Sequence, residues 1–342
     1  MFATSSQRKC WIFEDEKELD TLREEANARF IEAHKVSFFI HLTKMSYANY
    51  FFVFYSQKDT PRKYFLSPIE EKTLLRQYNI VLRDFCRKFQ PSMPKTVVGT
   101  AFQFYKRFYV NNSVMDYHPK HIVVTCVYLA CKVEEFNVSM DQFVANVKGD
   151  RAKAADIILN NELLLMAQLK YHLTVHNPFR PIEGLLIDIK ARFMNPGDVE
   201  KLRPQIDVFM NTVFFTDACL LFSPSQIALA SILDSASKCN IDLSSYLTDL
   251  LFSNAPEKLD QFYHMKENLK LMIENIEQVS KDQIKLIEKK LEKCRNQSNN
   301  PDSAEYRSGL EESLDNDVTA PMAKYAKISE KQRKYDDNIM QI

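Results

Sequence analysis

The sequence predicts an all-α protein of two tandem five-helix repeats, flanked by an N-terminal and a C-terminal helix. Three observations support this prediction. From residue 67 onward, apolar residues recur every three or four positions, as they do on one face of a helix. Helix-start signals occur at Ser67 and Ser223, each followed by Pro and, three residues on, by Glu or Gln. The stretch that begins at residue 118 also recurs 105 residues later in the chain.

Length and composition fit two soluble domains with a tail. The chain has 342 residues, of which 45% are hydrophobic and 26% are charged. Lys plus Arg equals Asp plus Glu at 45 each, which argues against binding nucleic acid through bulk charge. Only five glycines occur, and no two are close enough for a phosphate-binding loop. Seven cysteines without a C-x-x-C pattern indicate reduced thiols in a cytosolic or nuclear protein.

Residues 1–66 are predicted to hold an N-terminal helix and an atypical aromatic-rich insert. The helix, over residues 12–32, has apolar residues at spacings of three and four. The segment Lys35–Tyr55 is crowded with Phe and Tyr and shows neither a helical nor an alternating period. It is interpreted as a membrane span, an interfacial or partner-binding loop, or an inserted segment from a lineage-specific insertion or a retained intron. Polar residues interrupt every window of about 18 apolar residues, which disfavours the membrane span.

Residues 67–177 form the predicted first repeat. A capping box at Ser67 starts its first helix, because the Ser side chain caps a free amide and Glu70 caps the Ser amide in return. A helix over 118–136 is apolar all round, which places it in the middle of a domain. The five predicted helices cover about 67–89, 95–110, 118–136, 139–147 and 160–173.

Charged residues interrupt the apolar helices of this repeat. Lys132 and Glu134 lie at the end of the central helix, and Glu162 lies beside three leucines in the helix over 160–173. A half-buried charge without a partner is destabilising by several kcal/mol, at the upper end of the range of about 1–7 kcal/mol. We therefore expect Lys132 and Glu162 to pair with each other or with a group outside this chain.

Residues 178–280 form the predicted second repeat, with helices at about 181–193, 199–217, 224–238, 243–253 and 256–279. A shift of 105 residues aligns His118-Pro119 and the apolar run that follows with Ser223-Pro224 and its apolar run, as a duplicated domain would. Ser237 then occupies the place of Lys132, so only the first repeat carries the charged end. A C-terminal helix is predicted over 281–297, and the polar residues 298–342 are predicted to be disordered.

The sequence lacks the residue patterns of common catalytic and metal sites. His172 and His176 are four residues apart, as in some zinc sites, but the accompanying Glu is missing. No pair of acids is placed for general acid–base chemistry. We therefore predict that the chain is not an enzyme and that it needs neither a cofactor nor a metal.

Several segments resemble the cyclin family. The resemblance covers about residues 5–32 and 65–295, and its most specific part is Leu129-Ala130-Cys131-Lys132-Val133-Glu134-Glu135 at the end of the central helix. Further matching segments are Val97–Ala101, Tyr105–Tyr109, Asn111–Met115, Tyr117–Pro119 and Val175–Pro181. The resemblance implies two cyclin boxes, and it identifies the two repeats with them.

The resemblance also implies a site and partners. A Lys that ends the third helix and a Glu in the fifth contact the partner kinase in this family, and they correspond here to Lys132 and Glu162. The residues implied to complete the kinase-binding surface are Val133, Glu134, Met166, Tyr171 and Leu173. The implied partners are a cyclin-dependent kinase catalytic subunit, the RING-finger assembly factor of the CDK-activating kinase and the TFIIH core. The implied location is the nucleus, with no direct contact to nucleic acid or membrane.

The implied role is that of a regulatory subunit of a protein kinase. The cyclin would activate its kinase allosterically, in RNA polymerase II C-terminal domain phosphorylation and in cell-cycle control. Lys106 departs from the family pattern, because cell-cycle cyclins place an Asp there. Two alternatives stay open: a general transcription factor of the TFIIB kind, which also has cyclin-like repeats, and a cyclin-fold scaffold that activates no kinase.

Overall fold

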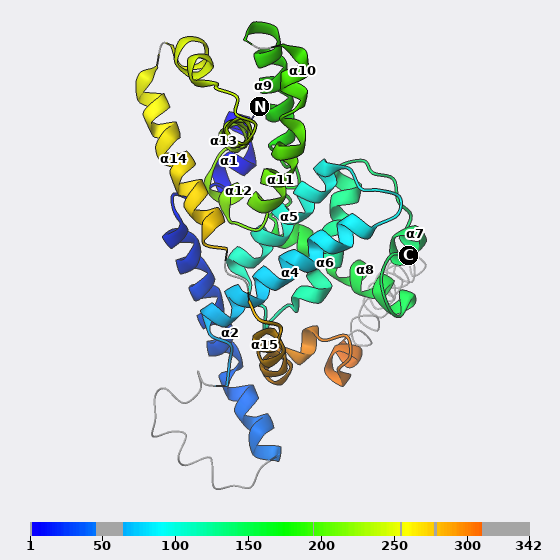
Figure 1. Ribbon diagram of the computed structural model, residues 1–342. Helices are drawn as coiled ribbons and strands as arrows, with labels where there is room; N and C mark the ends of the chain where they lie inside the picture. The colour runs from blue at the N-terminus through cyan, green and yellow to red at the C-terminus, as the bar shows by residue number, and fades with distance from the viewer. Residues whose placement is uncertain (1, 46–63, 194, 254, 277–278, 310–342) are drawn as a thin grey trace, which may run out of the picture. The chain divides into compact units, whose positions relative to one another are not determined.

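The computed structural model describes residues 2–45, 64–193, 195–253, 255–276 and 279–309. Within these ranges every regular element is a helix, so the all-α prediction is confirmed. The chain divides into two compact units, Met1–Cys294 and Arg295–Ile342. The first unit contains the helices from α1 to α15 (Figure 1). Most of the aromatic-rich insert and most of the predicted tail lie outside the described residues.

The first repeat is built around α6, as its apolar sequence predicts. The five helices of this repeat are α4 (Pro68–Lys88), α5 (Lys95–Asn111), α6 (Pro119–Val133), α7 (Met140–Val144) and α8 (Arg151–Gln168). Helix α6 contacts α4, α5 and α8, and Val127 and Ala130 on it are fully buried. The capping box at the start of α4 is also present, with Ser67 Oγ accepting from Glu70 N at 3.3 Å and Glu70 Oε2 accepting from Ser67 N at 2.8 Å.

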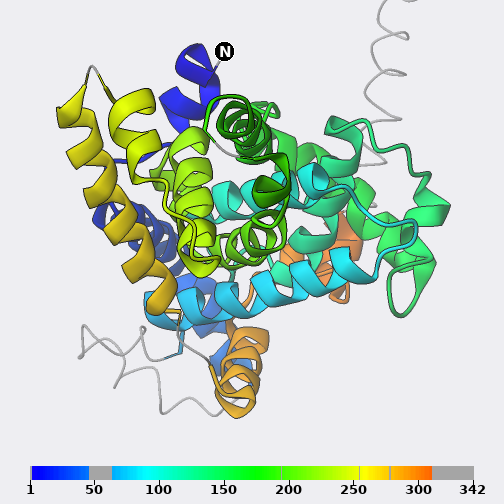
Figure 2. The ribbon, with the colours of Figure 1, turned by 45° about the horizontal axis from the view of Figure 1, so that its top comes forward.

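The second repeat has shorter and more broken helices than predicted. It contains α9 (Phe179–Arg192), α10 (Pro196–Glu200), α11 (Arg203–Val213), α12 (Ala218–Leu221), α13 (Pro224–Lys238), η3 (Tyr246–Leu251) and α14 (Pro256–Glu274). The single helix expected over 199–217 is two helices, because Pro204 starts a new one at its first turn. The helix expected over 243–253 is the π-helical turn η3. Figure 2 shows the helices of the second repeat packed beside those of the first.

The internal repeat extends to the backbone at the ends of α6 and α13. Each helix is followed by a residue in the left-handed region, Glu135 with φ 57° and Asn240 with φ 55°. The next residue donates back into the helix in both repeats: Phe136 N to Cys131 O at 2.9 Å and Ile241 N to Ala236 O at 2.8 Å. This is the hydrogen-bond pattern of a Schellman C-cap. The 105-residue shift therefore relates two equivalent structures as well as two similar sequences.

Helix α2 (Glu16–Met45) is longer than the N-terminal helix predicted over 12–32. It continues into the first part of the aromatic-rich segment, where the sequence shows no helical period. A hydrophobic period marks a helix only where one face is buried, so its absence does not exclude a helix. The buried side chains of α2 include Leu19, Ala26 and Phe30, which follow the predicted stripe. Through this face α2 contacts α4 and α5.

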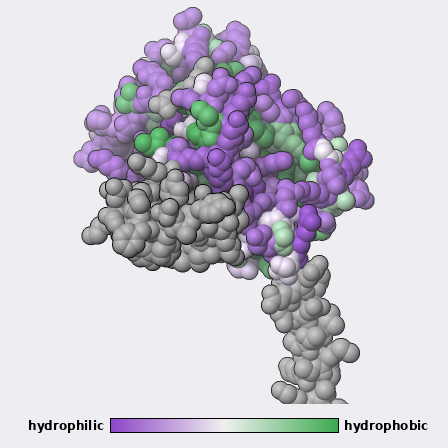
Figure 3. Space-filling model, turned by 90° about the horizontal axis from the view of Figure 1, so that it is seen from below, coloured by the Kyte–Doolittle hydropathy of each residue, from purple (hydrophilic) through white to green (hydrophobic). Residues whose placement is uncertain are grey.

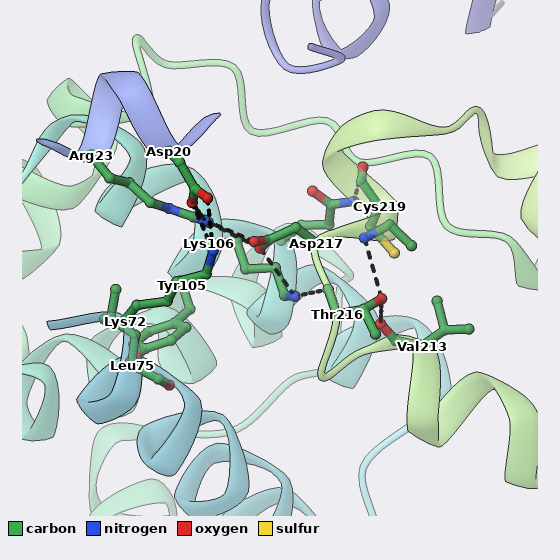
Figure 4. A network of polar contacts seen from close by, with 12 residues as sticks. Asp20, Arg23, Lys72, Leu75, Tyr105, Lys106, Val213, Thr216, Asp217 and Cys219 are labelled. Carbon is green, nitrogen blue, oxygen red and sulfur yellow. Dashed lines mark hydrogen bonds and ion pairs between the residues drawn. The ribbon is translucent and has the colours of Figure 1, made fainter. Parts of the chain in front are cut away.

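A network of charged side chains connects α2 to both repeats (Figure 4). Asp217, between α11 and α12, accepts from Arg23 of α2 at 2.7 and 3.0 Å. Lys106 of α5 lies 3.7 Å from the same carboxylate and also donates to the carbonyl oxygen of Thr216. Burial alone would raise the pKa of Asp217, but Arg23 and Lys106 hold it well below its ordinary value. Lys106, the departure from the family pattern, is therefore the buried partner of an acid from the second repeat.

Helix α15 (Lys281–Cys294) packs on α4. Its buried residues Ile284, Leu291 and Cys294 follow the predicted apolar stripe. Lys290 on its outer part donates to Glu70 Oε2 at 2.7 Å. Within the described residues no helix is long and apolar enough to span a membrane. On the face that Figure 3 shows, polar residues predominate and apolar ones lie between them.

The second unit is described only as far as residue 309. It contains the 3-10 turn η4 (Gln297–Asn299) and a helical turn over 304–309. Ser303 Oγ accepts from Tyr306 N at 3.0 Å at the start of that turn. This part of the tail, which the sequence predicts to be disordered, thus has local helical structure with a side-chain cap. The rest of the tail lies outside the described residues.

Candidate functional site

Helix α6, which carries the charged residues at its end, is buried and has a well-defined start and end. His118 Nδ1 accepts from Lys120 N at 3.1 Å, so His118 is the N-cap, and Pro119 occupies the first turn. The apolar body of the helix is buried, and the first strongly exposed side chain after it is Lys132, at 50%. Its ammonium group also lies 4.8 Å from the centre of the Tyr128 ring, one turn earlier. The buried helix thus holds one cation at the surface.

Lys132 and Glu162 pair with each other. Lys132 Nζ lies 2.7 Å from Glu162 Oε1 and 2.9 Å from Oε2. The Glu162 side chain is 13% exposed, so the carboxylate is mostly covered while the ammonium group remains open to solvent. Pairing within the chain was one of the two expectations for these charges. An ion pair with an exposed partner contributes only about 0–1 kcal/mol to stability. Stability alone is thus a weak reason for this arrangement.

Glu134 is held by the interior of the protein. Its Oε1 accepts from Thr100 Oγ1 at 2.6 Å, and that hydroxyl accepts from Asn177 Nδ2 at 2.9 Å. A Cβ atom at Gly99 would lie 2.4 Å from Asn177 Oδ1, so only glycine permits this close approach. The chain of contacts joins the end of α6, helix α5 and Asn177, the last residue before the second repeat. In this structure the carboxylate of Glu134 is therefore hydrogen-bonded to Thr100.

Helix α8 ends earlier than the sequence suggests. The predicted helix over 160–173 overlaps the second half of α8, which spans Arg151–Gln168. Lys170 and Tyr171 both have positive φ, 53° and 56°, and Tyr171 N donates to Met166 O at 2.9 Å. Two successive left-handed residues cannot continue a right-handed helix. Tyr171 and Leu173 consequently lie on the loop after α8, with Tyr171 62% exposed and Leu173 half-buried.

An exposed apolar stripe on α8 accompanies the Lys132–Glu162 pair. Leu159 and Leu163, on either side of Glu162, are 55% and 63% exposed, and Met166 continues the same spacing as a half-buried residue. Residues three and four apart share a helix face. The sequence shows these leucines, but their exposure depends on which face of α8 packs against α6. Val133 lies half-buried at the end of α6. The pair thus lies on a surface with apolar residues around it.

The loop after α8 is fixed by helix α1 (Ser6–Cys10), which the sequence analysis missed. The side-chain amide of Gln7 makes two bonds to His176: Oε1 accepts from its N at 2.7 Å and Nε2 donates to its O at 3.3 Å. Trp11, 1% exposed, hydrogen-bonds through Nε1 with His172 Nδ1 at 3.2 Å. A helix of five residues is too short to show an apolar period. Its docking nevertheless positions the loop that carries Tyr171 and Leu173.

Arg107 supports the same loop from α5. It is 1% exposed, donates to His172 O at 3.2 Å and lies 5.3 Å from the centre of the Trp11 ring. Burial lowers the pKa of Arg107 to about 9. His172 and His176 are thus used to anchor the N-terminal segment. Among the described residues there is no group of three His, Cys, Asp or Glu side chains that could hold a metal ion.

Comparison with known proteins identifies the two repeats. Residues 57–174 match the family model described as the cyclin N-terminal domain, and residues 177–296 match the cyclin C-terminal domain. A curated relative, cyclin-H of Xenopus laevis, is 40% identical over 298 residues, which cover 86% of this chain and 87% of the relative. The chain belongs to the cyclin family.

Other cyclins match over similar lengths. Cyclin-H1-1 of Arabidopsis thaliana is 32% identical over 71% of this cyclin and 72% of its own chain. Among solved structures, a chain of the CAK complex of Chaetomium thermophilum bound to ATP-γ-S has a TM-score of 0.73 at 24% identity, over 93% of this cyclin and 94% of that chain. A chain of the yeast TFIIK (Kin28/Ccl1/Tfb3) complex has a TM-score of 0.55 at 23% identity, over 79% of this cyclin and 99% of that chain. These structural matches establish the shared fold.

Proposed function

We propose that this cyclin binds and allosterically activates a cyclin-dependent kinase through the surface formed by the end of α6 and by α8. The observation that carries the proposal is the Lys132–Glu162 pair beside exposed leucines of α8. Exposed apolar groups that surround a charged pair are typical of protein interfaces, where burial of the apolar groups drives association. The kinase would cover Leu159 and Leu163 and form hydrogen bonds with the charged pair.

The residues proposed to form the kinase-binding surface or to hold it in place are those that the cyclin resemblance implies. They are Lys132, Glu162, Val133, Glu134, Met166, Tyr171 and Leu173. Lys132 is half exposed, so its ammonium group has donors left for a kinase carbonyl or carboxylate while it remains paired with Glu162. Tyr171 and Leu173 would contact the kinase from the loop that helix α1 holds. Glu134 would act by fixing the end of α6 through Thr100.

Activation would follow from a shift between two kinase conformations. The cyclin surface would bind the conformation in which the mobile helix of the kinase lies inward and its catalytic Lys–Glu pair is formed. A shift from 1:99 to 99:1 in favour of the active state requires about 5.5 kcal/mol of differential binding. The chemistry would belong wholly to the kinase. The cyclin is thus proposed to be a regulatory subunit and to have no enzymatic activity of its own.

The proposed complex is the CDK-activating kinase. Support comes from the relatives cyclin-H of Xenopus laevis and cyclin-H1-1 of Arabidopsis thaliana, and from the fold shared with chains of the CAK and TFIIK complexes. The further partners proposed are the RING-finger assembly factor and the TFIIH core. The proposed outcomes are phosphorylation of the RNA polymerase II C-terminal domain and of cell-cycle kinases, in the nucleus.

Three variants test the surface when the purified kinase is bound and assayed. Lys132→Ala, Glu162→Ala and Leu163→Asp should each weaken kinase binding, by about tenfold or more for a residue at the centre of an interface. Lys95→Ala is the matched control, because Lys95 also forms an exposed ion pair, with Asp207 at 2.6 Å, but belongs to α5 and is not one of the residues of the proposed surface. It should bind and activate as the wild type does.

Two outcomes would overturn parts of the proposal. If the three surface variants bind and activate the kinase as the control does, the assignment of the surface is wrong. If the wild-type cyclin binds the kinase but does not raise its activity, the chain is a cyclin-fold scaffold. Far-UV circular dichroism of each variant verifies that a loss of binding does not come from unfolding.

A further inference from the structure

A chain of hydrogen bonds links the end of α6 to the segment between the two repeats. Glu134 is the C-cap residue of α6, and its backbone N–H donates to Ala130 O at 3.0 Å. Its side chain accepts from Thr100 Oγ1 on α5, and Thr100 Oγ1 accepts from Asn177 Nδ2. Thr100 is 0% exposed and Asn177 is 9% exposed. The last turn of α6, which carries Lys132, is thus tied to two buried side chains outside its own helix.

The direction of each of these hydrogen bonds follows from the partners. Asn177 Nδ2 also donates to the carbonyl oxygen of Thr96 at 3.2 Å, and a carbonyl oxygen can only accept. The donor end of the Asn177 amide therefore faces both Thr96 and Thr100. A hydroxyl group has one hydrogen, and an ionised carboxylate can only accept. The Thr100 hydroxyl consequently donates to Glu134 and accepts from Asn177, so one side chain connects the two.

The close packing at Gly99 keeps Asn177 in this position. A Cβ atom at Gly99 would lie 2.4 Å from Asn177 Oδ1 and 3.3 Å from Phe179 Cε2. The first contact is too short for a real Cβ atom, so any side chain at this position would displace the Asn177 amide. The ring of Phe179 packs in turn against that of Phe214 in the second repeat, at 6.0 Å. Asn177 is therefore held at a junction to which both repeats contribute.

The chain of hydrogen bonds acts at the residue that ends α6. The last turn of a helix lacks part of its intrahelical hydrogen bonds and frays unless side chains or packing hold it. Lys132 lies in this turn, is half exposed, and reaches Glu162 of α8 through its long side chain. Fraying would move the backbone from which that side chain extends. The proposed contact of Lys132 with the kinase thus depends on a fixed end of α6.

We infer that Thr100 and Asn177 are positioning residues for the kinase-binding surface and act on Lys132 through Glu134. The inference rests on the proposed function, because it assigns a role within the same surface. Both residues are buried inside the cyclin, so neither of them touches the kinase. The segment between the repeats thereby sets the geometry of a surface that the first repeat carries. Correct docking of the second repeat is then a condition for full activation of the kinase.

Isosteric variants of the full-length cyclin test this inference by titration with the purified kinase. Thr100→Val replaces the hydroxyl by a methyl group and removes both of its hydrogen bonds. It should weaken kinase binding by about fivefold, whereas Thr100→Ser, which keeps the hydroxyl, should bind within about twofold of wild type. Thr125→Val is the matched control, because Thr125 is also 0% exposed but donates to His121 O within its own helix α6, at 2.9 Å. The control should bind as wild type does.

A double-mutant cycle separates positioning from a direct contact between Glu134 and the kinase. Once Glu134 is replaced by Ala, Thr100→Val should have little further effect on binding, because both changes remove the same hydrogen bond. Gly99→Ala leaves every hydrogen-bonding group in place but displaces Asn177, and it should weaken binding by about the same factor as Thr100→Val. This variant keeps the inference testable if Thr100→Val does not fold, which urea unfolding of each variant shows.

Two results would overturn the inference. The first is that neither Thr100→Val nor Gly99→Ala binds the kinase more weakly than Thr125→Val does. The second is that Thr100→Val and Glu134→Ala weaken binding independently, so that the double variant shows the product of the two effects. If Lys132→Ala weakens binding while the first result holds, this inference fails and the proposed surface stands. If Lys132→Ala binds as wild type does, the proposed surface itself is wrong.

Discussion

Glu71 is a single residue whose charge state controls part of the stability of this cyclin. It lies on α4, is 6% exposed, and accepts a hydrogen bond from Ser113 Oγ. Burial raises the pKa of Glu71 from 4.5 to about 7, although hydrogen bonds from Ser113 and Asn27 act in the opposite direction. A carboxyl group in this position is more stable in its protonated form. The folded state therefore binds a proton there that the unfolded state has released.

The free energy of unfolding should depend on pH because of this proton. Because the folded pKa of Glu71 is raised, its stabilising contribution is fully present below pH 4.5 and is lost as the pH rises to about 7. The loss amounts to about 3 kcal/mol. Glu71→Gln removes the titration, so the variant should become more stable than wild type by that amount above pH 7. Urea unfolding at several pH values, compared between the two proteins, measures it.

The neighbouring residue provides the control. Burial would raise the pKa of Glu70, but Lys290 and the Ser67 amide lower it overall. The stabilising contribution of Glu70 is therefore present above its ordinary pKa and is lost as the pH falls below it. Glu70→Gln should lose stability at neutral pH, the opposite sign to Glu71→Gln. A Glu71→Gln variant whose stability follows that of wild type from pH 4.5 to pH 8 would refute the assignment.

Elements far apart in the sequence are joined by the Asp217 network. Arg23 of α2 and Lys106 of α5 meet the carboxylate of Asp217 between α11 and α12. Each of these cations would be costly to bury alone, and burial does lower the pKa of Lys106. The carboxylate of Asp217 supplies a counter-charge to both cations. The network thus fixes helix α2 against the junction of the two repeats.

Asp217→Asn should destabilise the folded protein by about 3 kcal/mol, because it leaves Arg23 and Lys106 without a counter-charge. The difference from wild type should shrink below about pH 4, since the pKa of Asp217 is lowered in the folded state and its contribution is lost as the pH falls. Asp207→Asn breaks the exposed pair with Lys95 and should cost at most about 1 kcal/mol. Chemical unfolding of both variants measures these losses in the free energy of unfolding. Equal losses for Asp217→Asn and Asp207→Asn would show that the network does not contribute to stability.

Most of the buried apolar residues of the first unit belong to one hydrophobic core, and Leu19, Val110 and Leu220 form a second, small cluster. Buried residues from Phe30 to Cys294 form a single cluster that runs through both repeats. At the contact between them, the ring of Phe214 lies 5.2 Å from that of Phe102, nearly parallel to it, and 6.0 Å from that of Phe179. A core that is continuous across two repeats should make them unfold together. The two cyclin boxes are therefore expected to behave as one cooperative unit.

Unfolding measured by two probes tests this expectation. Trp11 is the only tryptophan and contacts the first repeat, so its fluorescence reports on that repeat, while far-UV circular dichroism reports on all helices. The two transitions should coincide. Phe214→Ala should lower the free energy of unfolding by about 3–5 kcal/mol and shift both transitions together. Two separate transitions would mean that the repeats unfold independently. So would hydrogen-exchange rates of the α13 amides that are the same in the variant and in the wild type.

Local patterns predicted the elements of this protein well. The capping boxes at Ser67 and Ser223 lie where the structure starts α4 and α13, because a cap depends only on residues three positions apart. The apolar sequence of α6 predicted its central position, and a pair between Lys132 and Glu162 was one of the two arrangements that the sequence allowed. The misplaced end of α8 and the missed α1 have one reason in common. Their geometry depends on left-handed residues and on docking, which carry no periodic signal.

The sequence by itself determined the helical class, the duplication and the membership of the cyclin family, since these depend on local periods and on motifs readable along the chain. Only the tertiary structure decided which charges meet across the chain. Arg23 and Asp217 are 194 residues apart, and Thr100 and Glu134 are 34 apart. It also decided which leucines of α8 face solvent and that Asn177 bonds to Thr100. Packing selects these pairs because an ion pair or a buried face requires proximity in space, which a sequence pattern does not specify.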